Sequence, residues 1–221
     1  EQSRIRTLQQ GKGLDGEGIH VCIVDTGVDL NHDDLDHMNI GFRDFVSSSD
    51  TPLDHGLDNH GTMMVGILVA DGHLKGAAPG VSLSVAAALG EQEGGETVGE
   101  TSLVAKAVEW CWKVMGADII SLSLGGMQDE NATSGKEVED AVSEALSKGV
   151  FVVAAAGNDG GFTDDGLVSS PANVPLVISV GASVEGGGVW ESSSKDTSTT
   201  SPDGSPREDP NLKPELIAPG H

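Results

Sequence analysis

Short apolar runs alternate along this chain with stretches in which apolar residues recur at helical spacing. The runs have almost no polar interruption and predict buried strands, which cover residues 20–24, 82–89, 118–124, 150–156 and 175–180. The helical stretches cover residues 62–70, 101–115 and 134–148, and a glycine or an Asp-Gly pair follows each of them. The chain is therefore predicted to alternate strands with helices along its length.

This alternation predicts the α/β class, with a doubly wound, mostly parallel sheet that carries helices on both faces. No long linker interrupts the pattern, so residues 1–221 are expected to form a single domain. In such a fold the ligand site lies at the carboxyl ends of the strands. Asp25 and Gly125 fall at strand ends and Asn158 lies just beyond one, so we expect these positions to converge on one edge of the sheet.

Charge narrows the classes of partner. The chain has 35 acidic and 12 basic residues, and the formal net charge of −23 disfavours nucleic acid and anionic membranes as partners. A cationic partner, a high-salt habitat and simple solubility are alternative reasons for this charge. No apolar run approaches the roughly 20 residues of a membrane helix.

Composition indicates an aliphatic core, because tyrosine is absent and aromatic residues are few. The two cysteines, Cys22 and Cys111, each lie in an apolar stretch and are expected to be buried free thiols rather than a disulfide. Free thiols would leave the cellular compartment open. The first residue is Glu1 rather than Met, which predicts a processed mature form or an excised piece.

Polar residues and glycines follow the apolar runs in a series of motifs. In chain order these are Val24-Asp25-Thr26-Gly27-Val28-Asp29, His60-Gly61-Thr62, Ser121-Leu122-Ser123-Leu124-Gly125-Gly126, Val152-Val153-Ala154-Ala155-Ala156-Gly157-Asn158 and Lys213-Pro214-Glu215-Leu216-Ile217-Ala218-Pro219-Gly220. Each motif is weak alone, but their order between Gly16 and Gly220 is specific. On these motifs the chain resembles the subtilisin-family serine proteases (subtilases), whose triad has the chain order Asp, His, Ser.

The resemblance implies catalytic roles for three residues. Asp25 would orient the imidazole of His60, His60 would shuttle protons, and the amide of Asn158 would stabilise an oxyanion. The structural alternatives are a strand-end Asp, a helix-capping His and a turn Asn. His55 competes with His60 as the base, but neither a Thr-containing motif nor an apolar helix follows it, so a surface role is expected for His55.

The resemblance also implies a polypeptide substrate. The predicted substrate-binding residues are Ser123, Leu124, Gly125, Ala154, Ala155, Gly157 and Ser169. The first three would bind the substrate main chain to main chain, with a plain strand end as the alternative. The next three would line a wall of the main specificity pocket, and Ser169 would lie at its base, where the family commonly has glycine. The Ser170-Pro171 bond matches a place where a cis peptide is expected.

The family's nucleophilic serine has no counterpart in these residues. In the family it opens a helix after the motif that ends here at Gly220, whereas Ser183 precedes that motif and Ser201 and Ser205 are loop serines. We therefore expect a serine endopeptidase truncated before its nucleophile, with that serine beyond residue 221 or in another chain. The chain as written would be inactive. The alternative is a non-catalytic, peptide-binding pseudoprotease.

Partners, location and cofactors follow from the same resemblance. A pro-segment (as in a zymogen), an inhibitor or a complementary C-terminal chain could occupy or complete the cleft. The family is most often secreted, so an extracellular location is expected, with an intracellular one as the alternative. No cofactor is required for this chemistry. Asp34 matches a family calcium ligand, but one carboxylate does not supply the about six to eight oxygens that calcium needs.

Overall fold

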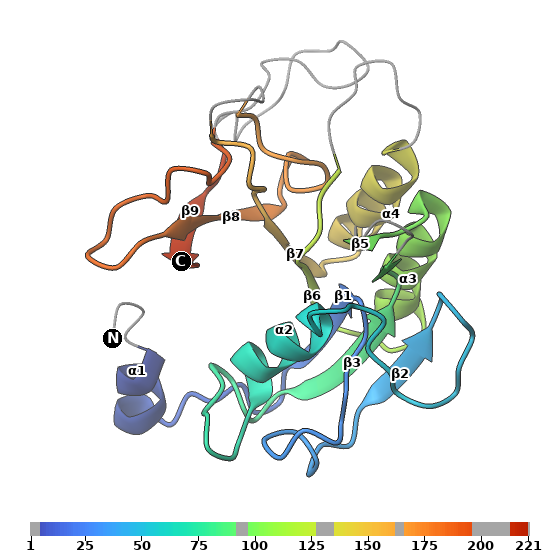
Figure 1. Cartoon of the computed structure of the whole chain (residues 1–221), viewed down its shortest axis with the longest axis vertical. Coiled ribbons are helices and arrows are strands. Elements are labelled where there is room, and N and C mark those ends of the chain that lie inside the picture. Colours follow the sequence, from blue (N-terminus) through green and yellow to red (C-terminus); the bar gives the residue numbers. More distant parts are fainter. Residues whose placement is uncertain (1–4, 92–96, 127–134, 162–165, 196–212, 221) are drawn as a thin grey trace. The chain divides into compact units, whose positions relative to one another are not determined.

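The structure, a computed structural model, describes residues 5–91, 97–126, 135–161, 166–195 and 213–220. The chain divides into two compact units, an N-terminal unit (Arg4–Ser121) and a C-terminal unit (Leu122–His221). Both units contain parallel strands and α-helices (Figure 1). The single-domain organisation stays a prediction.

The N-terminal unit is built from parallel strands and the helices between them. In chain order its elements are α1 (Ile5–Lys12), β1 (His20–Asp25), β2 (Gly41–Asp44), α2 (His60–Val69), β3 (Ser82–Ala87), β4 (Gly90–Glu91), β5 (Thr97–Val98), α3 (Thr101–Lys113) and β6 (Ile119–Leu122). The strand order is β2-β3-β1-β6, the pairs β1–β3 and β2–β3 are parallel, and β4 and β5 form a small antiparallel pair. The strands and helices predicted for this part of the chain are confirmed, with ends shifted by a few residues.

Strands β1 and β3 are covered on both faces. Every residue of β1 after His20 and of β3 after Ser82 is buried. Successive side chains of a strand point to opposite faces, so uninterrupted burial requires packing on each face of the sheet. Both α2 and α3 pack on β1. The core of this unit is aliphatic, as predicted, and includes Val21, Ile23, Val65, Val69, Leu83 and Val85.

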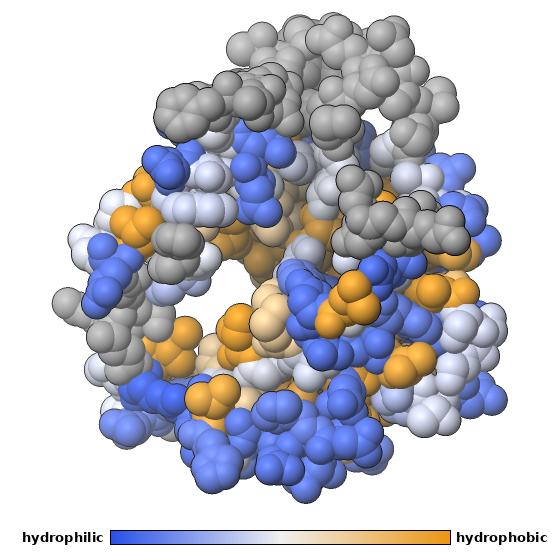
Figure 2. All heavy atoms as spheres, viewed as in Figure 1, coloured by the Kyte–Doolittle hydropathy of each residue, from blue (hydrophilic) through white to orange (hydrophobic). Residues whose placement is uncertain are grey.

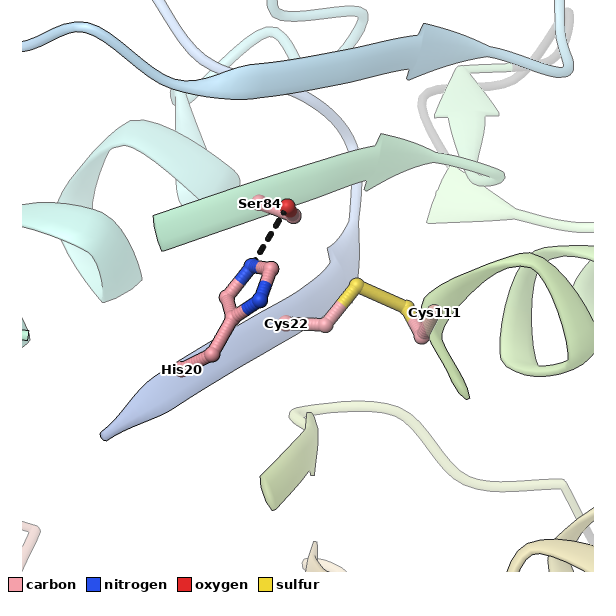
Figure 3. Close-up of a disulfide and its surroundings, with 4 residues drawn as sticks. All are labelled: His20, Cys22, Ser84 and Cys111. Carbon is pink, nitrogen blue, oxygen red and sulfur yellow. Dashed lines mark hydrogen bonds between the residues drawn. A yellow bond between two sulfur atoms is a disulfide. The ribbon is translucent and has the colours of Figure 1, made fainter. Parts of the chain in front are cut away.

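A disulfide joins β1 to α3, so the expectation of two free thiols is wrong. Cys22 and Cys111 are fully buried, their Cα atoms are 5.7 Å apart, and a bond joins their sulfur atoms (Figure 3). A Cα separation of this size is ordinary for a disulfide. The cysteines are 89 residues apart in sequence, and only the packing of α3 on β1 turns the two side chains toward each other.

The surface of the N-terminal unit is hydrophilic over the loops that follow β1 and α2 (Figure 2). These loops carry several acidic residues, among them Asp33, Asp36 and Asp71, in agreement with the negative charge of the chain. No helix in the described ranges has both the length and the apolar character of a membrane span.

The C-terminal unit contains α4 (Lys136–Ser147), β7 (Phe151–Ala155), β8 (Ile178–Ser183) and β9 (Leu216–Pro219). The three strands pair in parallel in the order β7-β8-β9, and α4 packs on β7. The helix predicted at 134–148 and the strand predicted at 150–156 are confirmed. The strand predicted at 175–180 begins later, because Leu176 has a φ of 68°, which a strand residue cannot adopt.

One face of this three-stranded sheet is apolar and open. Parallel neighbours share a face, and the register assigns to this open sheet face Phe151, Val153, Ala155, Ile178, Val180, Ala182, Leu216 and Ala218. None of these residues is buried, and Phe151 and Leu216 are 62% and 46% exposed. The opposite face is different, because Val152, Ala154 and Ser179 are buried there. The opposite face is therefore covered over β7 and β8, although Ile217 of β9 is 42% exposed there, whereas no residue of the open sheet face is buried.

Candidate active site

Asp25 and His60 meet within the N-terminal unit. Asp25 is the last residue of β1 and is fully buried, whereas His60 is the first residue of α2 and its side chain is 33% exposed. His60 Nδ1 lies 2.7 Å from Asp25 Oδ1. An ionised carboxylate can only accept, so Nδ1–H donates, and in the neutral ring the lone pair is then on Nε2. The structure places the pair as the sequence analysis expects, and its catalytic role stays a prediction.

The turn after β1 fixes the carboxylate of Asp25. Its Oδ1 also accepts the backbone N–H of Thr26 at 2.7 Å and lies 3.3 Å from Thr26 Oγ1. Its backbone carbonyl accepts N–H groups of Ala88 and Leu89, which ties the end of β1 to the end of β3. Oδ2 is buried and has no hydrogen-bond partner in the described part of the chain. Oδ1 is therefore the atom through which this carboxylate acts on His60.

The first turn of α2 holds His60 close to that turn. A Cβ on Gly61 would collide with the carbonyl oxygen of Gly27 and would lie 3.0 Å from Thr26 Oγ1. Only glycine lets α2 begin this close to the end of β1. Gly61 N–H donates to Thr26 Oγ1 at 2.8 Å. Close packing of α2 against the turn after β1 thus explains why a glycine follows His60 in the sequence motif.

The pKa of His60 is raised above its ordinary value. The hydrogen bond to Asp25 is the largest cause, and partial burial acts in the opposite direction. The charges of Asp25, Asp58 and Asp54 add to the rise. The protonated imidazole is therefore stabilised, as a base that holds a proton during a reaction requires.

The competing histidine, His55, has a carboxylate of its own. His55 Nε2 lies 2.9 Å from Asp44 Oδ2, and the His55 side chain is only 14% exposed, so the expected surface position is wrong. Burial acts to raise the pKa of Asp44, but hydrogen bonds from Ser47, His55 and Val46 outweigh it and bring the pKa to about 2. This second pair ties the end of β2 to the loop before α2, and it leaves His60 as the partner of Asp25.

Asn158 lies in the C-terminal unit, in the loop that follows β7, and is exposed. Gly157 before it has a φ of 111°. A Cβ on Gly157 would collide with Ser169 Oγ, so glycine is needed here both for its backbone conformation and for this close approach. The convergence of Asn158 with Asp25 and His60 stays a prediction.

The predicted substrate strand, Ser123, Leu124 and Gly125, continues from the end of β6. The next residue, Gly126, forms an antiparallel bridge with Ser170, in which the two backbones exchange N–H···O bonds of 3.0 and 3.2 Å. Ser169 N–H donates to the carbonyl of Ala156 at 2.8 Å. The backbone of 169–170 is thus bonded on one side to the end of the substrate strand and on the other to the β7 loop that leads to Asn158.

The carboxylate of Asp159 lies next to Ser169, the predicted base of the specificity pocket. Of its predicted wall, Ala155 is exposed and Ala154 is buried. Ser169 Oγ donates to Asp159 Oδ2 at 3.2 Å, which brings a carboxylate to the predicted base of the pocket. The Ser170-Pro171 peptide is cis, as predicted.

Asp34, which matches a family calcium ligand, anchors the loop that follows α2. Its carboxylate accepts the backbone N–H groups of His73 and Leu74, at 2.5 and 3.2 Å, in the loop after α2. Burial acts to raise the pKa of Asp34, but these N–H groups, with His32 and His73, lower it overall. In the described ranges no cluster of three or more acidic, His or Cys side chains is arranged to hold a metal ion.

The sequence motifs do not predict the position of Asp54, whose carboxylate binds residues on either side of the Asp25–His60 pair. Asp54 accepts hydrogen bonds from the hydroxyls of Thr26 and Thr62. Thr26 directly follows Asp25, and Thr62 follows His60 by two residues. A hydroxyl residue in each motif was the only signal in the sequence, and nothing there distinguished Asp54 from its acidic neighbours.

Solved structures define the class of protein to which this fold belongs. The chain is similar to a cold adapted subtilisin-like serine proteinase, with a TM-score of 0.70 and 27% identity, over 94% of this chain and 64% of that one. It is also similar to the S218A mutant of the protease domain of PatA, with a TM-score of 0.69 and 26% identity, over 82% of this chain and 64% of that one. The predicted α/β fold class, with its mostly parallel sheet, is confirmed.

The family model described as "Subtilase family" matches residues 16–221, and the chain belongs to the subtilase family. It is 35% identical over 177 residues to the "Major intracellular serine protease" of Bacillus subtilis (strain 168), covering 77% of this chain and 53% of that protein. It is 33% identical over 228 residues to "Serine protease AprX" of the same strain, covering 96% of this chain and 48% of that protein. The chain thus spans about half the length of these relatives.

Proposed function

We propose that this chain supplies the acid, the base and the oxyanion-binding amide of a serine endopeptidase. The observation that carries the proposal is the fully buried Asp25 carboxylate, 2.7 Å from His60 Nδ1 at the end of a parallel strand. A buried acid that fixes one nitrogen of an imidazole leaves the other nitrogen to act as a base. Membership of the subtilase family supports the same roles.

The proposed reaction passes through an acyl-enzyme. A serine hydroxyl attacks the carbonyl carbon of the scissile peptide bond while His60 Nε2 takes the hydroxyl proton. Asp25 stabilises the imidazolium, and the side-chain amide of Asn158 donates to the oxyanion of the tetrahedral intermediate. His60 then gives its proton to the leaving amine, and water hydrolyses the ester by the same path. Ser123, Leu124 and Gly125 would bind the substrate chain.

The serine itself would come from beyond residue 221 or from another chain. The open sheet face supports this part of the proposal, because monomers rarely leave a large contiguous apolar surface to water. A helix that carried the serine and packed on β7, β8 and β9 would bury that face. The chain would then be inactive alone and active when completed.

Labelling with a fluorophosphonate probe tests the proposal. We expect the full-length protein to be labelled at a serine outside residues 1–221, residues 1–221 alone to stay unlabelled, and His60→Ala to suppress labelling. If neither the full-length protein nor an associated chain is labelled, while peptides still bind, the non-catalytic peptide-binding alternative is correct.

We propose further that the substrates are polypeptides, that a pro-segment, an inhibitor or a complementary chain can occupy the site, and that no cofactor is needed. Chelation with EDTA should therefore leave peptide hydrolysis by the full-length protein unchanged, and a loss restored by calcium would contradict this. The Cys22–Cys111 disulfide supports an oxidising compartment and hence secretion. Cell fractionation combined with thiol alkylation would test that location.

A further inference from the structure

Asp54 accepts four hydrogen bonds, which come from the turn after β1, from the loop before α2 and from the first turn of α2. Its Oδ1 accepts the Thr26 hydroxyl at 2.6 Å and Gly56 N–H at 3.0 Å. Its Oδ2 accepts Thr62 N–H at 2.8 Å and the Thr62 hydroxyl at 2.6 Å. Partial burial acts to raise the pKa of Asp54, but these hydrogen bonds outweigh it and lower the pKa. Asp54 is therefore an ionised acceptor with donors on both oxygens.

Each threonine hydroxyl accepts a hydrogen bond from a backbone N–H and donates its own proton to Asp54. Thr26 Oγ1 accepts Gly61 N–H at 2.8 Å, and Thr62 Oγ1 accepts Asp29 N–H at 2.9 Å. A hydroxyl has one proton to donate, and in both threonines the carboxylate of Asp54 lies 2.6 Å away to receive it. Asp54 thereby links the segment that follows Asp25 to the helix that begins with His60.

The Thr26 hydroxyl has a second acceptor within reach, which is the one used by His60. Thr26 Oγ1 lies 3.3 Å from Asp25 Oδ1 and 2.6 Å from Asp54 Oδ1. The single hydroxyl proton goes to the nearer carboxylate, because hydrogen bonds weaken with distance. Without Asp54 the hydroxyl would turn to Asp25 Oδ1 and compete there with His60 Nδ1–H.

We propose that Asp54 is a positioning residue of this site: it draws the Thr26 hydroxyl away from Asp25 Oδ1 and keeps that oxygen available to His60. The importance of this for turnover rests on the proposed roles of Asp25 and His60. Asp54 touches neither substrate nor reacting atoms, and it acts through Thr26 and Thr62. Its charge is also distinct from that of Asp58, which is exposed and acts on His60 through space alone.

Proton NMR of the full-length protein tests the positioning role without any need for activity. In Asp54→Ala the low-field Nδ1–H resonance of His60 should move upfield, because Asp25 Oδ1 then also accepts the Thr26 hydroxyl. In Asp54→Ala/Thr26→Val the resonance should return toward its wild-type position, because the competing hydroxyl is gone. In Asp58→Asn, the matched loss of one charge, the resonance should stay in place when all variants are compared at a pH above the folded pKa, where His60 is neutral in each of them. Asp54→Asn replaces Asp54→Ala if the alanine variant does not fold.

Peptide hydrolysis by the full-length protein gives the second readout. Asp54→Ala should lower kcat by up to about 100-fold with little change in KM, because the catalytic pair is misplaced, and the added Thr26→Val should restore part of the loss. A purely structural role would lower stability and activity with no rescue by Thr26→Val, and that result, with an unmoved Nδ1–H resonance, would overturn the inference. If the wild-type protein hydrolyses nothing, the proposed function fails, while the NMR result still decides the role of Asp54.

Discussion

The two units of this chain differ in how fully their parallel strands are buried and in how well their candidate site residues are held by neighbouring side chains. In the N-terminal unit, β1 and β3 are buried on both faces, a disulfide ties β1 to α3, and the Asp25–His60 pair is supported by Thr26 and Asp54. In the C-terminal unit, the open sheet face is exposed and Asn158 lies on an exposed loop. The comparison indicates that the acid–base pair is preorganised by its own unit, whereas the three-stranded sheet of the C-terminal unit leaves one apolar face open.

Removal of the base should have the largest effect. We expect His60→Ala in the full-length protein to lower kcat by about a million-fold, because the serine then has no proton acceptor. Stability should fall below pH 6.5, where the raised pKa of His60 stabilises the fold, and should change less at a pH above the folded pKa, where the imidazole is neutral. Steady-state hydrolysis of a peptide substrate, with thermal unfolding of the same samples, measures both quantities.

The matched control is His55→Ala. His55 has its own partner in Asp44, so its loss should affect stability more than turnover. Equal losses of kcat in the two variants would break the assignment of His60 as the base of the N-terminal unit.

Removal of the disulfide should have the next largest effect, and it should be confined to one unit. Cys22 and Cys111 close a loop of 89 residues, for which chain entropy predicts about 4 to 5 kcal/mol of stabilisation at 25 °C. Cys22→Ala/Cys111→Ala should therefore lower the unfolding free energy by an amount of this order. Urea unfolding measures the loss, and hydrogen exchange shows where it falls.

Exchange protection should decrease in β1, β3 and α3 and should be unchanged in β7 and α4. A uniform loss of protection over both units would show that they unfold together, and the contrast between the two units would not hold.

Truncation of the oxyanion amide tests the C-terminal unit. Asn158→Ala should lower kcat by about 10²- to 10³-fold with KM unchanged, because the donor acts only on the charge that develops in the transition state. The exposed position of Asn158 predicts little effect on stability. An unchanged kcat would make Asn158 a turn residue and would confine the chemistry of this chain to the N-terminal unit.

The parts that could be predicted from sequence are those whose signal is local. Asp25 ends an apolar run and His60 opens a helical pattern, so strand, helix and candidate pair could all be read from neighbouring residues. The disulfide, the Asp44–His55 pair and Asp54 could not, because each joins residues that come together only when helices and loops pack on the sheet. The late start of β8 reflects the backbone of Leu176, whose positive φ no hydrophobic pattern reveals.

The smallest expected effect concerns pH and Asp58. The pKa of His60 is raised from 6.5, chiefly by Asp25 and to a lesser extent by the charges of Asp58 and Asp54. Because the folded pKa is the higher one, this stabilisation of the fold is fully present below pH 6.5 and is lost as the pH rises through the folded pKa. The neutral form is the base, so kcat/KM should rise over that same interval.

Asp58→Asn should therefore move the rising limb of the pH–rate profile to lower pH and leave the plateau at high pH unchanged. Asp58 is exposed, so its effect is screened by salt, and at about 1 M ionic strength, where the Debye length is about 3 Å, the two profiles should nearly coincide. The part of the rise that comes from the Asp25 hydrogen bond should persist at high salt. A limb that moves by the same amount at low and high salt would mean that Asp58 acts on His60 through contact rather than through its charge, and that the N-terminal unit holds its base by more partners than Asp25, Thr26 and Asp54.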